Sequence, residues 1–504
     1  MVSNVLVLGG GSAGFLAAIS LKHRLPRLTV TIVRSPEIGI IGVGEGTTVG
    51  VPQYLHYYLG ISPADFYRIA EPQWKLGIRF LWGKRPYFDY PFAFQLDTKY
   101  NQLSKGTGFY CGEGSFDYVG VATGLMSHNN VFVRHPNGHP LIGGEVAYHI
   151  ENELFVRFLE TLAVKLGVII HNDTIVEVKQ DDHGIAGLRL ASGVEMNADL
   201  YMDCSGYASV LLGKALQEPF VSFKNTLFND RAVVGGWTRT HEPIKPYTTA
   251  ETMSAGWCWQ IDHEHRINRG YVYSSSFISD ADADAEFRAA NPLVTQTRIV
   301  KFLSGRYERG WVKNVVGIGN SSGFVEPLES TSLAAICAQS QAVAEALADC
   351  DDPGPAMIGQ YNKRTARNWE SIRRFLGLHF KFNMRYDTPY WQACRADADI
   401  SEAAEVVAYY QENGPSVVFR SSLLAADDQF GMEGYLSLLV GQQVPHRSTY
   451  RPTAAELNIW SQLKKKIQIV ASSAVSVREA LATIRAPNFA WHDRNFYQLP
   501  RAPG

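Results

Sequence analysis

The stretch Val5-Leu6-Val7-Leu8-Gly9-Gly10-Gly11-Ser12-Ala13-Gly14 decides the fold of this chain. An apolar run precedes the glycines and an apolar stretch over 15–21 follows them, so the order is strand, glycine turn, helix. Gly9 permits a tight turn, Gly11 lets the backbone approach a pyrophosphate, and Gly14 lets helix and strand pack closely. The N-terminus of the helix would present N–H groups to the phosphates. The sequence therefore predicts a Rossmann-type dinucleotide site at the start of the chain.

Composition is that of an ordinary globular protein and excludes several classes of partner. Hydrophobic residues make up 46% and charged residues 19% of the 504 residues, and the net charge of −2 does not favour nucleic acid or an acidic membrane surface. The six cysteines contain no Cys-x-x-Cys pair and suggest neither a zinc site nor a disulfide framework. No apolar run reaches transmembrane length, and the N-terminus lacks the basic region of a signal peptide. We expect a cytoplasmic protein without a membrane partner.

Two features after the first helix bear on the choice of dinucleotide. A second strand is predicted over 29–33, and the position after it usually holds an acid that binds the ribose hydroxyls. Arg34 stands there instead, and an arginine suits a 2′-phosphate, which favours NADPH on this feature alone. The glycine-rich run 41–48 predicts a loop on which a ligand can lie close to the backbone, although a plain surface loop has the same composition.

A strand is predicted over 71–82, where apolar and polar residues alternate. One face carries Trp74, Leu76, Ile78, Phe80 and Trp82. Lys75 lies on the other face, and on this pattern alone it is interpreted as a solvated strand lysine.

Antiparallel strands are predicted over 231–277. Within them, alternation places Trp257, Trp259 and Ile261 on one face, and the spacing leaves open whether this aromatic face borders a site or fills a core. His263 and His265 follow in an expected turn and are interpreted as solvated.

The segment 314–332 predicts a strand, a glycine loop and then a long helix that begins near Ser330 and ends near Leu347. Serine and threonine at that start are typical N-caps, but the same place offers N–H groups to an anion or to an electron-rich ring. Two matches to the Gly-x-Ser-x-Gly nucleophile pattern, at 10–14 and 319–323, are interpreted as coincidences of glycine-rich turns.

The rest of the chain divides into loops and helices. Long loops are expected over 100–145, a helix over 151–166, and a tail over the last ten or so residues. Further helices are expected over 357–382, 401–411 and 454–484. We therefore predict two domains, residues 1–354 and a mostly helical part over 355–504.

Four stretches together resemble the flavin-dependent halogenases of the tryptophan halogenase type, over residues 3 to about 440. They are the opening glycine turn with Ile41-Gly42-Val43-Gly44-Glu45, Lys75 in its strand, Gly256-Trp257-x-Trp259-x-Ile261, and Phe324-x-Glu326-Pro327-Leu328-Glu329-Ser330-Thr331. The third stretch is the signature of that family. The resemblance implies an α/β fold, in which a Rossmann-type FAD-binding domain is interleaved with an antiparallel sheet as in flavin monooxygenases. The helical C-terminal part would cover the substrate pocket.

The resemblance also implies the reaction and its partners. The enzyme would use FADH2, O2 and chloride or bromide to make hypohalous acid and halogenate an electron-rich, indole-like arene. A separate flavin reductase would supply FADH2, and the other partner would be the small aromatic substrate. A homodimer is left open. Two alternatives remain: a flavin monooxygenase that hydroxylates the arene, and a flavoprotein that binds FAD without turnover.

The resemblance assigns roles to residues of this sequence. Lys75 would hydrogen-bond the hypohalous acid or carry the halogen as a haloamine. Glu329 would orient that lysine and stabilise or deprotonate the cationic arene intermediate. FAD would be held by Gly9, Gly11, Ser12, Ala13, Gly14, Arg34, Gly42, Val43, Gly44, Glu45 and Gly319. Thr331 and Ser332 match the halide site, and the substrate pocket would contain Tyr90, Phe92, Trp257, Trp259 and Ser330.

The sequence departs from the family pattern at several positions, and one of these departures bears on the substrate. Asp262 replaces the proline that usually closes the tryptophan motif, Ser332 replaces a usual glycine, and Arg34 replaces the usual acid. The segment 434–437 lacks the paired tyrosines that hold the amino acid backbone in enzymes acting on free tryptophan. An indole-like arene without a fixed amino acid handle is therefore expected.

Overall fold

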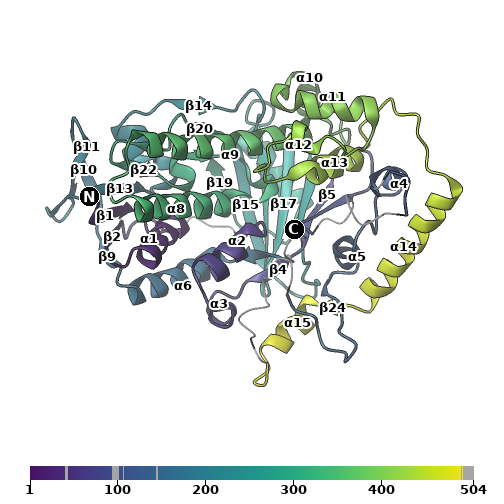
Figure 1. The fold of residues 1–504 in the computed structure, drawn as a ribbon, viewed down its shortest axis with the longest axis horizontal. Coiled ribbons are helices and arrows are strands. Elements are labelled where there is room, and N and C mark those ends of the chain that lie inside the picture. The colour runs from purple at the N-terminus through teal and green to yellow at the C-terminus, as the bar shows by residue number, and fades with distance from the viewer. Residues whose placement is uncertain (40–43, 94–101, 106, 144–145, 490, 492–504) are drawn as a thin grey trace. The chain divides into compact units, whose positions relative to one another are not determined.

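The computed structural model describes residues 1–504 except 40–43, 94–101, 106, 144–145, 490 and 492–504 (Figure 1). The chain forms two compact units, and each is assembled from three separate segments. Unit 1 comprises 1–72, 150–224 and 302–372, and unit 2 comprises 73–149, 225–301 and 373–504. The predicted tail lies mostly outside the described residues, and the predicted division at residue 354 stays a prediction.

Unit 1 is built on a mainly parallel sheet with the strand order β21-β22-β13-β1-β2-β9. The strands are β21 (Trp311–Val312), β22 (Val315–Gly317), β13 (Leu200–Asp203), β1 (Asn4–Leu8), β2 (Thr29–Arg34) and β9 (Ile169–Asn172). In the register of β1, Leu8 lies between Val33 of β2 and Asp203 of β13. Parallel strands need helical crossovers, and α1 (Ser12–Arg24) packs against α6 (Asn152–Lys165) and α8 (Ser332–Asp349). The expected Rossmann-type arrangement is confirmed.

Smaller elements complete unit 1. They are β3 (Glu45–Gly46), α2 (Gly50–Gln53), η1 (Tyr54–Tyr58), α3 (Pro63–Ile69), β10 (Ile175–Asp181), β11 (Gly184–Leu190), β12 (Glu195–Met196), η2 (Gly206–Ala208), η3 (Val210–Ala215), β14 (Phe220–Ser222), β20 (Gly305–Tyr307), η4 (Gly319–Ser321), β23 (Gly323–Phe324) and η5 (Pro327–Glu329). One core cluster joins buried residues of β11, such as Leu188, to Leu6 and Leu8 of β1. The β10–β11 hairpin is thereby anchored to the parallel sheet.

Unit 2 contains a seven-stranded sheet with the order β19-β15-β18-β17-β16-β5-β6. Its strands are β19 (Thr297–Lys301), β15 (Arg231–Thr238), β18 (Arg266–Tyr273), β17 (Gly256–Asp262), β16 (Thr248–Met253), β5 (Gly77–Leu81) and β6 (Phe88–Pro91), and α7 (Asp280–Ala290) packs on β15 and β18. All neighbouring pairs are antiparallel except β16 and β5. The antiparallel strands expected over 231–277 are confirmed.

The strand predicted over 71–82 is two strands. β4 (Gln73–Lys75) pairs with β8 (Ala147–Ile150), whereas β5 joins the large sheet. The break is at Leu76, whose N–H donates to the carbonyl of Pro246. Because β4 is covered on both faces, Lys75 is fully buried. The interpretation of Lys75 as a solvated lysine is therefore wrong.

The C-terminal part of the chain is mostly helical, as predicted. Its helices are α9 (Pro355–Lys381), α10 (Pro389–Asp397), η6 (Ser401–Ala403), α11 (Ala404–Asn413), α12 (Arg420–Leu423), α13 (Gly431–Gly441), α14 (Ala454–Ser472) and α15 (Val477–Ile484). The single helix predicted over 454–484 is wrong: β24 (Val475–Ser476) interrupts it and pairs with β7 (Asn130–Phe132). Ser476 then caps α15 by accepting from the N–H of Glu479.

The long loops expected over 100–145 also contain α4 (Phe109–Gly112) and α5 (Val121–Ser127). Helix α14 packs on α5, which explains why this short helix is stable. No helix among the described residues has the length and apolarity needed to cross a membrane.

Candidate active site

The glycine turn between β1 and α1 has the geometry that its sequence predicts. Gly9 has φ of +114°, and a Cβ there would lie 2.4 Å from the carbonyl oxygen of Cys204. A Cβ on Gly14 would lie 1.9 Å from the carbonyl oxygen of Gly9. At Gly11, by contrast, a Cβ would meet no described atom within 4 Å. Gly9 and Gly14 are thus required by protein packing, whereas the open side of Gly11 leaves room for a ligand.

Helix α1 presents its N-terminus to this turn. Gly11 is the N-cap, no side chain of the described residues caps the helix, and its first turn has no acidic residue. Gly319 (φ +61°) lies beside the same turn, since its Cβ position is 3.7 Å from the Cβ of Ala13. The structure therefore brings the predicted residues 9–14 and Gly319 together, with N–H groups available to phosphate.

Arg34 follows β2 as predicted, but its guanidinium is held by protein acceptors. Nη1 and Nη2 donate to the two carboxylate oxygens of Glu160 at 2.8 and 2.7 Å, and Nε donates to Asn172 at 2.7 Å. The side chain also lies over the Phe15 ring, 5.9 Å from its centroid. A role of Arg34 in binding the dinucleotide stays a prediction.

Asn152, the first residue of α6, holds the end of the predicted glycine-rich loop. Its Oδ1 accepts from the N–H of Gly44 at 3.1 Å, and its Nδ2 donates to Glu45 at 2.7 Å. Burial raises the pKa of Glu45. Sequence reasoning missed Asn152, whose only signal was its place at the start of a predicted helix. The predicted residues Gly42 and Val43 lie outside the described residues.

In unit 2, Lys75 lies beside the first ring of a chain of aromatic contacts. Its Nζ lies 4.9 Å from the centroid of the Phe92 ring, within the range of a cation–π contact. The Phe92 ring is perpendicular to that of Tyr90, at 6.4 Å, and Tyr90 lies 5.9 Å from Phe375. Phe375 in turn stacks on Phe430 at 3.8 Å. The predicted residues Lys75, Tyr90 and Phe92 therefore come together, and sequence reasoning missed Phe375 and Phe430.

The segment that lacks the paired tyrosines packs against this aromatic cluster. A Cβ on Gly434 would lie 2.9 Å from the hydroxyl oxygen of Tyr90, so the glycine makes room for that ring. The hydroxyl of the neighbouring Tyr435 is fully buried and accepts from Nε of Arg374 at 2.8 Å. Tyr435 is thus committed to a protein contact.

Trp257 and Trp259 form a buried pair on one face of β17, which we call the tryptophan wall. Their ring centroids are 6.1 Å apart. The indole of Trp259 covers Gly270 of β18, where a Cβ would lie 2.0 Å from the ring. The wall is therefore fixed by its neighbours.

The turn after β17 differs from the prediction. His265 is exposed, but His263 is buried, and neither ring nitrogen has a hydrogen-bond partner among the described residues. Burial lowers the pKa of His263 to about 4, so the ring is neutral near pH 7. The interpretation of His263 as solvated is wrong, because the residue is only 5% exposed.

In unit 1, Glu329 ends η5 and is buried. Ser330 has φ of +58°, and α8 begins at Ser332, two residues later than predicted. Thr331 is the N-cap, but its side chain makes no capping hydrogen bond within the part of the chain that the structure describes. The predicted capping role is therefore not realised, and the first turn of a long helix presents its N–H groups as an anion site requires. Thr331 and Ser332 lie at that turn, directly after Glu329.

Comparison with known proteins gives a consistent result. The family model described as tryptophan halogenase matches residues 4–457. The chain is 32% identical to the tryptophan 7-halogenase KtzQ of Kutzneria sp. (strain 744) over 442 residues, which are 82% of each chain. It is similar to the solved structure of MibH, a lanthipeptide tryptophan 5-halogenase, with 38% identity, a TM-score of 0.88 and coverage of 96% and 94% of the two chains. A flavin-dependent halogenase from Brevundimonas sp. BAL3 has a TM-score of 0.83 at 26% identity, with 96% and 99% covered.

Proposed function

Because the chain belongs to the tryptophan halogenase family and is a flavin-dependent halogenase, we propose that it uses FADH2, O2 and chloride or bromide to halogenate an indole-like arene. The observation that carries this proposal is the buried Lys75 beside the Phe92 ring, which in turn contacts Tyr90. The glycine turn fits a dinucleotide, since Gly11 is open where a pyrophosphate would approach. Reduced flavin, supplied by a separate reductase, provides with O2 the oxidising equivalents that convert halide to hypohalous acid.

Lys75 is proposed to hold the hypohalous acid or to carry the halogen. Its amine can donate a hydrogen bond to the oxidant, and a fully buried site keeps water from competing for the halogen. The aromatic rings beside it are flat, apolar surfaces on which an indole can stack.

Glu329 is proposed to orient the lysine and to accept the proton released by the arene. A buried carboxylate suits both tasks. The N-terminus of α8, at Thr331 and Ser332, is proposed to bind the halide, because its N–H groups have no side-chain cap among the described residues. Ser330 would complete the substrate pocket.

The tryptophan wall is proposed to separate the flavin from the arene, which would suppress direct hydroxylation. The substrate is proposed to be an indole whose amino acid groups are not gripped by the protein. Two observations support this substrate class: Tyr435 is committed to Arg374, and the chain is 38% identical to a halogenase that acts on a tryptophan of a lanthipeptide.

The test supplies the protein with FAD, an added flavin reductase, NADH, O2, and chloride or bromide. Indole, free tryptophan and a tryptophan-containing peptide are offered separately, and products are read by the halogen isotope pattern in mass spectrometry. A halogenated indole or peptide is expected, with free tryptophan a poorer substrate. A hydroxylated product alone would favour the monooxygenase alternative, and FAD binding without turnover would favour the non-catalytic one.

Two variants test the residue roles. Lys75→Ala should abolish halogenation and keep FAD binding, which is measured by fluorescence titration. Glu329→Gln should lower the rate about 10²–10⁴-fold, the contribution of one acid–base group. Unchanged halogenation in either variant would remove that residue from the mechanism.

A further inference from the structure

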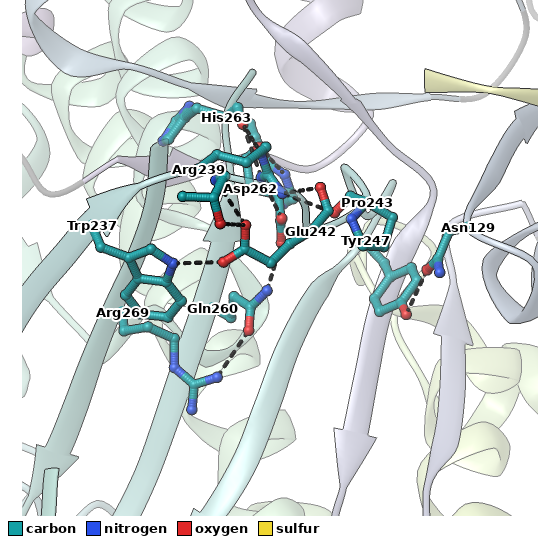
Figure 2. A network of polar contacts seen from close by, with 12 residues as sticks. Asn129, Trp237, Arg239, Glu242, Pro243, Tyr247, Gln260, Asp262, His263 and Arg269 are labelled. Carbon is teal, nitrogen blue, oxygen red and sulfur yellow. Dashed lines mark hydrogen bonds and ion pairs between the residues drawn. The ribbon is translucent and has the colours of Figure 1, made fainter. Parts of the chain in front are cut away.

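The face of β17 opposite the tryptophan wall carries a buried charge network, shown in Figure 2. Asp262 is 0% exposed and pairs with Arg239, whose side chain is 1% exposed, at 2.5 Å between Oδ1 and Nη2. The other carboxylate oxygen accepts from Nε2 of Gln260 at 2.9 Å. Asp262 stands where the tryptophan motif usually ends in proline, so this chain places a buried ion pair at that position.

Arg239 directs its remaining donors to the backbone of two turns. Nε and Nη2 donate to the carbonyl of His263 at 3.1 and 2.9 Å. Nη1 donates to the carbonyls of Glu242 and Pro243 at 3.2 and 2.8 Å. The planar guanidinium therefore ties the turn after β15 to the turn after β17, which a lysine could not do with the same geometry.

The network continues across the sheet. The Oε1 atom of Gln260 accepts from Nη1 of Arg269 at 2.9 Å, and Nη2 of Arg269 donates to Glu251 at 2.9 Å. Figure 2 shows Arg239, Asp262, Gln260 and Arg269 along one path. Strands β16, β17 and β18 are thus joined by side chains as well as by their backbone ladders.

His149 connects this strand end to the strand pair that carries Lys75. Its Nδ1 lies 3.2 Å from the carbonyl oxygen of Asp262, which can only accept, so Nδ1 donates. Its Nε2 then accepts from the Thr248 hydroxyl at 2.9 Å. In the antiparallel pair of β8 and β4, His149 is opposite Gln73 and Ala147 is opposite Lys75.

We propose that Arg239 and Asp262 are positioning residues, which fix the end of β17 so that His149 holds β8 and, through it, Lys75 in register with the tryptophan wall. This proposal rests on the role of Lys75 proposed above. Stability alone is a poor explanation of the pair, because a buried ion pair is often no more stabilising than apolar side chains of similar volume. Orientation is what an apolar pair would not supply.

The test separates positioning from stability. Arg239→Met, Asp262→Asn and the double variant are compared by urea unfolding, by the rate of FADH2 oxidation and by the halogenated product formed per FADH2 oxidised. Each single variant leaves one polar or charged partner buried and should unfold at lower urea than the wild type, while the double variant should recover part of the loss. Arg231→Met, which breaks the Arg231–Asp280 pair at the other end of β15, is the matched control.

The product per FADH2 should fall about ten- to a hundredfold in both single variants and stay low in the double variant, because misplacement of about 1 Å costs rates of this size. His149→Ala, with the ion pair intact, should give the same fall, and the Arg231 control should not. If the product ratio recovers together with stability in the double variant, or if His149→Ala keeps the wild-type ratio, the positioning role is overturned.

The outcome is distinguishable from failure of the proposed function. If Lys75→Ala still halogenates, the role of Lys75 fails whatever the network variants do. If Lys75→Ala is inactive and the network variants keep the wild-type product ratio, only the positioning proposal fails.

Discussion

Replacement of Gly270 by alanine should displace the indole ring of Trp259 in the tryptophan wall. Gly270 on β18 lies opposite Trp259 on β17, and the added Cβ would be 2.0 Å from Cζ2 of the indole. An ordinary contact needs at least 3.4 Å, so the ring must retreat by 3.4 − 2.0 = 1.4 Å or the strands must separate. The neighbouring Trp257 ring, 6.1 Å away, limits that retreat.

Two opposing effects set the size of the change in stability. Overpacking of a well-packed core costs about 1–3 kcal/mol. Replacing a strand glycine by alanine returns about 0.5–1 kcal/mol of conformational entropy. The free energy of unfolding of Gly270→Ala should therefore fall by at most about 2.5 kcal/mol. A ring displaced by more than 1 Å should also lower the ratio of halogenated to hydroxylated product, by up to about a hundredfold.

The assay is urea unfolding followed by circular dichroism, together with the ratio of halogenated to hydroxylated product by mass spectrometry. Gly359→Ala in α9 is the matched control, because its added Cβ meets no described atom within 4 Å, and it should stabilise by about 0.5–1 kcal/mol. If Gly270→Ala keeps both the stability and the product ratio of the wild type, the wall does not depend on this contact and the reasoning is refuted.

Further substitutions test the dinucleotide turn and the buried histidine. Gly14→Ala should abolish FAD binding, because its Cβ would lie 1.9 Å from the carbonyl oxygen of Gly9, whereas Gly11→Ala should keep the fold and only weaken binding. Fluorescence titration measures the FAD affinity of each variant, and circular dichroism measures its fold. Equal affinities of the two variants would contradict the roles given to Gly14 and Gly11. The pKa of His263 is lowered to about 4 in the fold, so the unfolded chain binds more protons and stability falls as pH decreases from about 6.5 towards 4. The free energy of unfolding, measured with urea, should fall by about 2 kcal/mol between pH 7 and pH 5, and His263→Asn should remove this fall. An unchanged pH dependence in the variant would exclude His263 as its source.

The sequence by itself determined the dinucleotide turn and the family. Glycine spacing reports backbone conformation directly, so Gly9 and Gly14 could be assigned their tasks before any contact was known. Alternation likewise placed Trp257 and Trp259 on one face of a strand, since side chains alternate along a strand whichever strand pairs with it.

Only the tertiary structure decided the environment of each polar side chain. Lys75 has the local pattern of a solvated residue, yet it is buried. The predicted strand breaks into β4 and β5, and β4, which carries Lys75, pairs with β8. His263 has the pattern of a turn, yet it is enclosed. Burial depends on which distant strands come to cover a residue, and a pattern over a few neighbours carries no information about them.

Asp262 illustrates both what the sequence reports and what only the structure explains. The sequence marks it as a departure from the motif but offers no reason for a carboxylate in place of a proline. Its partner Arg239 lies 23 residues away on the chain, and the acceptor for His149 is a backbone carbonyl, which no side-chain pattern reports. Such long-range pairs form when the fold brings separate strands to one end of a sheet, so their meaning appears only in three dimensions.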